Sequence, residues 1–203
     1  GGLEQTLDEG KQKGITMDDD HSVLVRDTKT GQLRLVTEKQ MFIPGPHEKV
    51  EEVRELVRLA EHEAMIIKDK DSNFDFKYGS GEKGTSESRS FFLPPYAEVV
   101  SLRWSRGPRR EVRDLLIDRI DCRAQFMAFE FNSRTKDNVD LVIEGVLFWE
   151  IADLPLMVRT TGDMTGDICQ HTRSQFIRHV ARVDLKEFME DINSISSKVH
   201  SED

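Results

Sequence analysis

The chain has 203 residues and a formal net charge of −9, with 37% hydrophobic and 33% charged residues. This length allows one to three small domains, and the acidic balance argues against a general nucleic-acid-binding protein, which needs a basic surface. No apolar run approaches the length of about 18 residues that a membrane span needs, and the start lacks the basic and apolar stretches of a signal peptide.

The first segment, residues 1–19, is polar and contains glycine, and we expect a flexible lead-in. It opens with Gly1 and Gly2 and has no initiator methionine. The sequence is therefore expected to be an excised part of a longer protein.

One pattern then appears twice. Residues 21–27 and 62–69 carry apolar residues and one basic residue at corresponding positions, and they end in Val-Arg-Asp and Ile-Lys-Asp. Residues 41–46 and 91–96 match likewise, with Met-Phe-Ile-Pro answering Phe-Phe-Leu-Pro. The period of roughly 42 to 50 residues is typical of stacked modules, and a module this small needs a neighbour to bury its apolar face.

The first copy predicts an antiparallel β repeat module over residues 20–56. A turn over residues 28–32 separates its first two strands, and Gly31 supplies the positive φ that such a hairpin needs.

The second copy predicts a module over residues 57–104. Its turn, 69–73, leads into a strand at 74–78 whose alternation places aromatic residues on one face. Residues 79–90 are rich in Gly, Ser, Glu and Thr and predict a mobile polar insertion.

A basic run follows at residues 103–110, which holds four arginines and one tryptophan. Two interpretations stay open: a solvated linker, or a surface that binds phosphate or anionic lipid.

Residues 111–152 predict antiparallel strands in a meander. In the last of these strands, alternation places one apolar set on a single face: Val139, Leu141, Ile143, Gly145, Leu147 and Trp149.

The apolar period changes from two to 3.6 after Asp153, so residues 166–195 are expected to be mainly helical. Asp153 caps a short helix with Pro155 in its first turn. A second helix is predicted over 165–182, and a third begins at Asp184. Four residues are expected to form the buried face of the third helix: Leu185, Phe188, Met189 and Ile192.

In the core, Phe176 and Val180 of the second helix are predicted to pack on Leu147 and Trp149. Strands followed by helices indicate an α+β domain over 111–197.

Residues with catalytic or metal-binding chemistry do not form a recognisable site. His171 and His179 are too far apart on one helix to share a metal without a third ligand, and Cys169 and His171 point to different helix faces. Cys122 and Cys169 give no disulfide framework, and two buried thiols in a reducing compartment are expected. Trp104 and Trp149 are expected to be core residues.

Two acidic turns are candidates for binding a metal ion. Asp18–Asp20 with His21, and Asp69 with Asp71, supply oxygen ligands for Ca²⁺, but neither follows the pattern of an EF-hand loop. Exposed turn carboxylates are the simpler interpretation. We therefore predict no enzyme, no cofactor and no catalytic or metal-binding residue.

The order of these segments resembles the family of the major vault protein and its paralogues. The two β repeats resemble vault repeats, and residues 111–197 are similar to the shoulder domain that follows them and to the SPFH domain of stomatins, prohibitins and flotillins. The segments that carry this resemblance are 134–139, 145–151, 166–169, 174–180 and 183–188.

The resemblance implies a multidomain β and α+β protein: two β repeat modules followed by an SPFH-like domain. It implies a non-catalytic scaffold segment of a self-assembling cytoplasmic ribonucleoprotein particle, whose partners are neighbouring copies rather than nucleic acid. The alternative is a peripheral membrane-organising module of the stomatin or flotillin type, in which residues 103–110 touch anionic head groups. The absence of an apolar hairpin or lipidation motif argues against that alternative.

Overall fold

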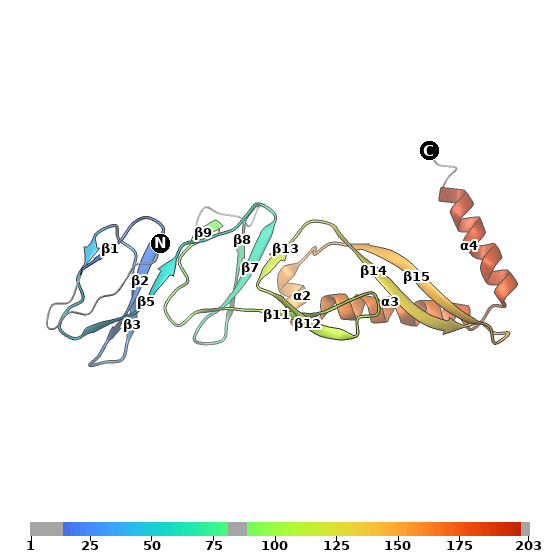
Figure 1. The fold of residues 1–203 in the computed structure, drawn as a ribbon, viewed down its shortest axis with the longest axis horizontal. Coiled ribbons are helices and arrows are strands. Elements are labelled where there is room, and N and C mark those ends of the chain that lie inside the picture. Colours follow the sequence, from blue (N-terminus) through green and yellow to red (C-terminus); the bar gives the residue numbers. More distant parts are fainter. Residues whose placement is uncertain (1–13, 81–88, 200–203) are drawn as a thin grey trace. The chain divides into compact units, whose positions relative to one another are not determined.

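The computed structural model describes residues 14–80 and 89–199, with side chains described as far as residue 192. Most of the predicted lead-in (1–19) and most of the predicted insertion (79–90) lie outside these residues. The chain is mostly β with a few helices, and it divides into two compact units (Figure 1). The first unit comprises residues 1–100 and 118–121, and the second comprises residues 101–117 and 122–203.

The first sheet of the first unit is built around strand β2 (His21–Asp27), which pairs with β3 (Leu33–Val36) and β5 (Glu48–Glu55). β1 (Ile15–Thr16) pairs with β4 (Met41–Phe42) beside it, and Met17 is buried, so the prediction of a flexible lead-in is wrong for residues 15–17. The predicted turn after β2 is confirmed, with Gly31 at φ 74°. A small core fills this part, made of Met17, Val23, Val25, Val36 and Phe42.

The second sheet of this unit is built around β7 (Glu63–Lys68). β8 (Phe74–Tyr78) follows the predicted turn and pairs with β7, and β10 (Glu98–Val99) pairs with β7 as well. β6 (Val57–Arg58) pairs with β9 (Ser90–Phe91).

A third partner of β7 corrects the sequence-based expectation. β13 (Arg119–Asp121) belongs to the stretch predicted as one meander, yet it pairs with β7 and lies in the first unit. Ile120 explains this pairing, because its side chain is buried in that sheet with Ala64 as its direct neighbour.

The second unit contains two strand pairs. β11 (Leu102–Arg106) pairs with β12 (Val112–Ile117), and β14 (Gln125–Arg134) pairs over its full length with β15 (Asp140–Trp149). Residues 111–152 are therefore largely strands, as predicted, but they form three separate pairings instead of one meander.

The β14–β15 ribbon has a clear inner face. Along β15 the predicted apolar set is partly buried, while every intervening residue is exposed, which confirms the alternation. Helix α3 (Met164–Val180) lies along this inner face (Figure 1), and Cys169 packs with Phe129 and Phe131 there.

The predicted core contacts of α3 need correction. Val180 packs against Leu141 and Ile143, which lie four to eight residues before the predicted partners Leu147 and Trp149 on β15. Phe176 contacts the rings of Phe129 and Phe131 and stays 39% exposed. Trp149 instead meets Trp104 edge-on, with ring centroids 6.2 Å apart.

The helices begin close to the predicted residues. α2 (Leu154–Thr160) is capped by Asp153, whose carboxylate accepts the N–H of Leu156 at 2.8 Å. α4 (Leu185–Val199) begins directly after Asp184. In α4, Phe188 is buried, but Met189 and Ile192 are exposed, contrary to the prediction. The first turn of α4 holds the contacts with the ribbon: Leu185 N–H donates to Asp137 in the β14–β15 turn at 3.2 Å, and Phe188 packs against Leu141 and Ile143.

Candidate functional site

The basic run forms a β-hairpin, so the linker interpretation is wrong. β11 and β12 pair with a bulge between Trp104 and Arg106, and the turn closes where Gly107 and Arg110 adopt φ of 83° and 55°. Residues 101–117 hold five arginines and two carboxylates, which gives a local charge of +3 in a chain of −9. The hairpin is therefore a basic surface on an acidic protein.

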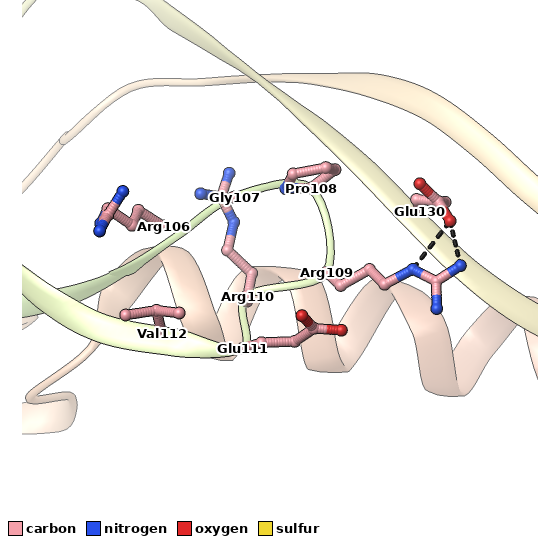
Figure 2. A pocket seen from close by; sticks show the side chains of 8 residues that line it. All are labelled: Arg106, Gly107, Pro108, Arg109, Arg110, Glu111, Val112 and Glu130. Carbon is pink, nitrogen blue, oxygen red and sulfur yellow. Dashed lines mark hydrogen bonds and ion pairs between the residues drawn. The ribbon is translucent and has the colours of Figure 1, made fainter.

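A hollow of about 190 Å³ lies beside the turn (Figure 2), lined by Arg106, Gly107, Pro108, Arg109, Arg110, Glu111, Val112 and Glu130. On one side of it, Arg109 binds Glu130 through two guanidinium nitrogens, and its Nε lies 2.8 Å from the carboxylate. This hydrogen bond raises the pKa of Arg109 above its ordinary value. The ion pair neutralises this wall and ties the turn to β14.

Arg106 is also paired with a carboxylate. Its Nε and Nη2 lie 2.5 and 2.9 Å from the two oxygens of Asp114, the planar two-point contact that guanidinium groups form well. The hydrogen bond from Arg106 lowers the pKa of Asp114. Figure 2 shows Arg106 and Arg109 directed away from each other, so the hollow has no converging pair of free arginines.

Arg110 differs from these two arginines. Its side chain turns back toward Gly107 and Pro108 (Figure 2), and its Nη1 donates to the carbonyl of Ser105 at 3.4 Å. Its Nε is buried without a hydrogen-bond partner, and it makes no ion pair with any described residue. Arg110 thus keeps a positive charge that no described carboxylate neutralises.

Asp163 anchors the hairpin to α3 within the second unit. Its carboxylate caps α3 at Gly166 N–H (3.1 Å), and it accepts both the N–H of Ser105 (2.8 Å) and the Ser105 hydroxyl. Arg113 Nε lies 3.8 Å away. Burial raises the pKa of Asp163, but the hydrogen bonds from Ser105 and Gly166 and the charge of Arg113 together outweigh burial and lower it overall. The basic hairpin is therefore held in a fixed position on the unit.

The acidic turns weighed as Ca²⁺ sites are used internally. Asp18 binds His21 (2.6 Å), and the hydrogen bond between them lowers the pKa of Asp18 and raises that of His21. Asp69 accepts the N–H groups of Asp71 and Asn73. Within residues 14–80 and 89–192, no group of three His, Cys, Asp or Glu side chains is placed to hold a metal ion.

The cysteines and histidines do not meet in a reactive arrangement. Cys169 is buried in the core with Phe129 and Phe131, while His171 is exposed. Cys122 is only partly buried, so the prediction of two buried thiols is right for Cys169 alone. His179 is exposed and lies 3.8 Å from Asp191.

One surface escaped the sequence analysis. The outer face of the β14–β15 ribbon carries Phe126 and Phe148, which are direct cross-strand neighbours and are 72% and 82% exposed. The sequence does contain a signal for this surface: Val142, Val146 and Phe148 are apolar although they occupy outward-facing positions of β15. A strand that is apolar on both faces indicates a second contact surface.

Comparison with known proteins identifies the family. Residues 90–202 match the SPFH domain / Band 7 family, which is more than half of the chain. The chain belongs to the SPFH domain / Band 7 family. The match supports the SPFH part of the resemblance and fits a stomatin- or flotillin-type module better than a vault shell. None of the curated proteins compared with the chain matches it.

The SPFH domain therefore includes the basic hairpin, the β14–β15 ribbon and the helices. Among the residues that the structure describes, no helix is both long and apolar enough to cross a membrane.

Proposed function

We propose that this chain is a non-catalytic, peripheral membrane-organising module of the stomatin and flotillin type. The observation that carries the proposal is the SPFH match over residues 90–202. The chemistry of the described side chains is compatible with it, because Arg106, Arg109 and Arg134 of the second unit are each paired with a carboxylate.

The basic hairpin supports contact with a membrane surface. Anionic lipids attract basic residues by about 1 kcal/mol per Lys or Arg near the surface. Arg110 has no carboxylate partner in the described chain, whereas Arg106 and Arg109 are paired. We expect the turn that holds Arg110 to meet the head groups.

Vesicle flotation tests the proposal. The chain is expected to float with vesicles that contain phosphatidylserine, to float less with pure phosphatidylcholine, and to lose binding as salt rises, because salt screens the attraction. Arg110→Gln is expected to weaken binding several-fold, whereas the control Lys136→Gln, with the same charge change at an exposed site, leaves it unchanged. No flotation at low salt on either vesicle type contradicts the proposal.

A second candidate, a segment of a vault-like shell, is favoured by the arrangement of strands in the first unit. β1–β4 and β6–β9 are matching pairs, and β2 and β7 each have a run of four buried residues followed by a turn closed by an aspartate, Asp27 or Asp69. This correspondence supports two repeat modules, the first of which includes β1 (Ile15–Thr16) and therefore begins before residue 20.

Contacts between the two segments support stacking. Tyr96 hydroxyl accepts the N–H of Leu33 at 2.6 Å, and Arg54 Nη1 donates to the carbonyls of Leu93 (2.7 Å) and Pro94 (2.8 Å). Electron microscopy of the chain at high concentration tests this candidate. Closed rings or shells support it, and dispersed particles at every concentration argue against it.

A further inference from the structure

The outer face of the β14–β15 ribbon is an apolar patch that the described part of the chain leaves uncovered. Phe126 lies opposite Phe148 with ring centroids 6.4 Å apart, and Ala128 lies opposite Val146 in the next row of this face. Phe126 is 72% exposed and Phe148 is 82% exposed. Two adjacent exposed phenylalanines form a continuous surface, unlike the isolated apolar residues that most proteins expose, and such a surface marks a contact site.

The inner face of the same ribbon shows which kind of element fits its surface. Helix α3 lies along that face (Figure 1), where Cys169 and Ile177 pack with Phe129 and Phe131. A strand that is apolar on both faces, as β15 is, is typical of a sheet with a layer on each side. A helix on the outer face would complete a three-layer arrangement of helix, ribbon and helix.

The outer face also has the length of a short helix. Its apolar positions on β15 run from Phe148 through Val146 to Val142, and each of the three side chains is more than half exposed. At about 3.3 Å per residue of strand, the distance from Phe148 to Val142 is about 20 Å. A helix rises by about 1.5 Å per residue, so about 13 residues, or three to four turns, would span this face.

Acidic side chains border the patch. Glu144 lies next to Val146 on the same face, and Glu150 comes directly after β15. Both are exposed, and neither makes an ion pair with a residue that the structure describes. Glu130, opposite Glu144, is bound by Arg109. A partner that covers the patch therefore needs basic residues beside its apolar ones.

This acidic border disfavours two other occupants. An anionic lipid surface would be repelled by it. Helix α4 exposes Met189 and Ile192, but it also carries Glu187 and Glu190, so α4 of another copy would bring like charges together. The charge of the patch thus favours a basic helix from a different protein.

We propose that the outer face of the β14–β15 ribbon docks an amphipathic helix of another protein, about three to four turns long, whose apolar stripe is flanked by lysine or arginine. The apolar stripe covers Phe126, Phe148 and Val146, and the basic residues pair with Glu144 and Glu150. Helices that bind in this way place an apolar anchor at every third or fourth position. The inference goes beyond the proposed membrane function and does not depend on it.

Fluorescence anisotropy with three labelled peptides tests the inference on the whole chain, without lipid. The probe is a peptide of about 14 leucines and lysines, with leucine at every third or fourth position. One comparison peptide has the same composition with its leucines spread around the helix, and the other has glutamate in place of each lysine. The probe is expected to bind saturably and at least about tenfold more tightly than either, because only the probe combines the basic flank with the apolar stripe.

Substitutions on the ribbon locate the binding site. Phe148→Ser and Glu144→Lys are each expected to weaken binding of the probe about tenfold, as central residues of an interface do. The same changes at exposed positions of the first unit, Phe74→Ser and Glu38→Lys, are the matched controls and are expected to leave binding unchanged. Glu144→Lys is also expected to bind the glutamate peptide more tightly than the wild type does, whereas Glu38→Lys is not.

Several results would overturn the inference. It is wrong if the wild-type chain does not bind the probe, if it binds the probe and the rearranged peptide equally, or if Phe148→Ser and Glu144→Lys bind the probe like the wild type. If Phe148→Ser reduces vesicle flotation or association between copies but binds the probe normally, the face serves lipid or a second copy instead. Binding of the probe by a wild-type chain that does not float with vesicles contradicts the proposed membrane function alone.

Discussion

Asp163 is the residue on which the second unit depends most clearly. Its carboxylate accepts hydrogen bonds from Ser105 in the hairpin and from Gly166 at the start of α3. Replacing one partner of a buried hydrogen-bond network leaves other groups unsatisfied, and each such group costs about 1–3 kcal/mol. A single side chain thus couples the basic hairpin to the helix.

We therefore predict that Asp163→Asn lowers the free energy of unfolding by about 1–3 kcal/mol at pH 7. Urea denaturation followed by tryptophan fluorescence is the measurement, because both tryptophans of the chain, Trp104 and Trp149, lie in the second unit. Glu144→Gln, an exposed residue without a partner in the described chain, is the control. Equal stability of the two variants would show that Asp163 does not anchor the hairpin.

The stability difference between the wild type and Asp163→Asn is also expected to depend on pH. The pKa of folded Asp163 lies below its ordinary value of 3.8, so its stabilisation is complete above that value and is lost as pH falls through the folded pKa. The stability difference between wild type and Asp163→Asn should be constant from pH 7 to about 5 and shrink below about 4. A difference that stays constant down to pH 2.5 contradicts this assignment.

The partial exposure of Phe176 lowers the loss in free energy of unfolding that is expected for Phe176→Ala. Full burial against Leu147 and Trp149 predicted a loss of about 3–5 kcal/mol for Phe176→Ala. Because the side chain is 39% exposed, the predicted loss falls to about 1–3 kcal/mol, while Phe131→Ala, at a buried ring, keeps the larger value. Denaturant titration of both variants checks the order, and a larger loss for Phe176→Ala would reverse it.

At the scale of elements, the β14–β15 ribbon is shaped by one close approach. Gly145 lies opposite Phe129, and a Cβ at Gly145 would come within 2.5 Å of that ring. Gly145→Ala is predicted to displace the ring and destabilise the unit by about 1–3 kcal/mol. Ala128→Ser, on the exposed face, is the control for tryptophan-monitored denaturation. An unchanged midpoint for Gly145→Ala would mean that the ring moves freely.

Alternation and capping made much of this fold predictable. The inward set of β15, the positive φ at Gly31 and the cap at Asp153 all follow from local chemistry. Pairing between distant strands does not, which is why β13 was assigned to a meander although Ile120 completes the sheet around β7. Sequence gives a strand's faces but not its partners.

The candidate site was predictable only in part. The basic run was visible in the sequence, but its arginines could not be sorted into paired and unpaired ones. That distinction depends on Asp114 and Glu130, which reach the hairpin turn only after the strands have paired. The exposed ribbon face was missed because Phe126 and Phe148 are 22 positions apart and become neighbours only through the strand register.

At the scale of the whole molecule, charge is unevenly distributed. The hairpin over residues 101–117 carries +3, so the remainder of the chain carries −12. Copies repel one another at low salt except where the hairpin meets an acidic surface. An anionic membrane is the surface proposed to meet the hairpin, through Arg110 at the turn.

The central claim is that this chain binds anionic membrane surfaces through its basic hairpin. Equilibrium binding to phosphatidylserine-containing vesicles over a series of salt concentrations tests it most directly, because salt screens the attraction between arginines and head groups. We predict that the affinity of the wild-type chain falls steeply as salt rises and that the fall is shallower for Arg110→Gln. Binding that does not change with salt, or equal salt dependence for the two chains, would contradict the account.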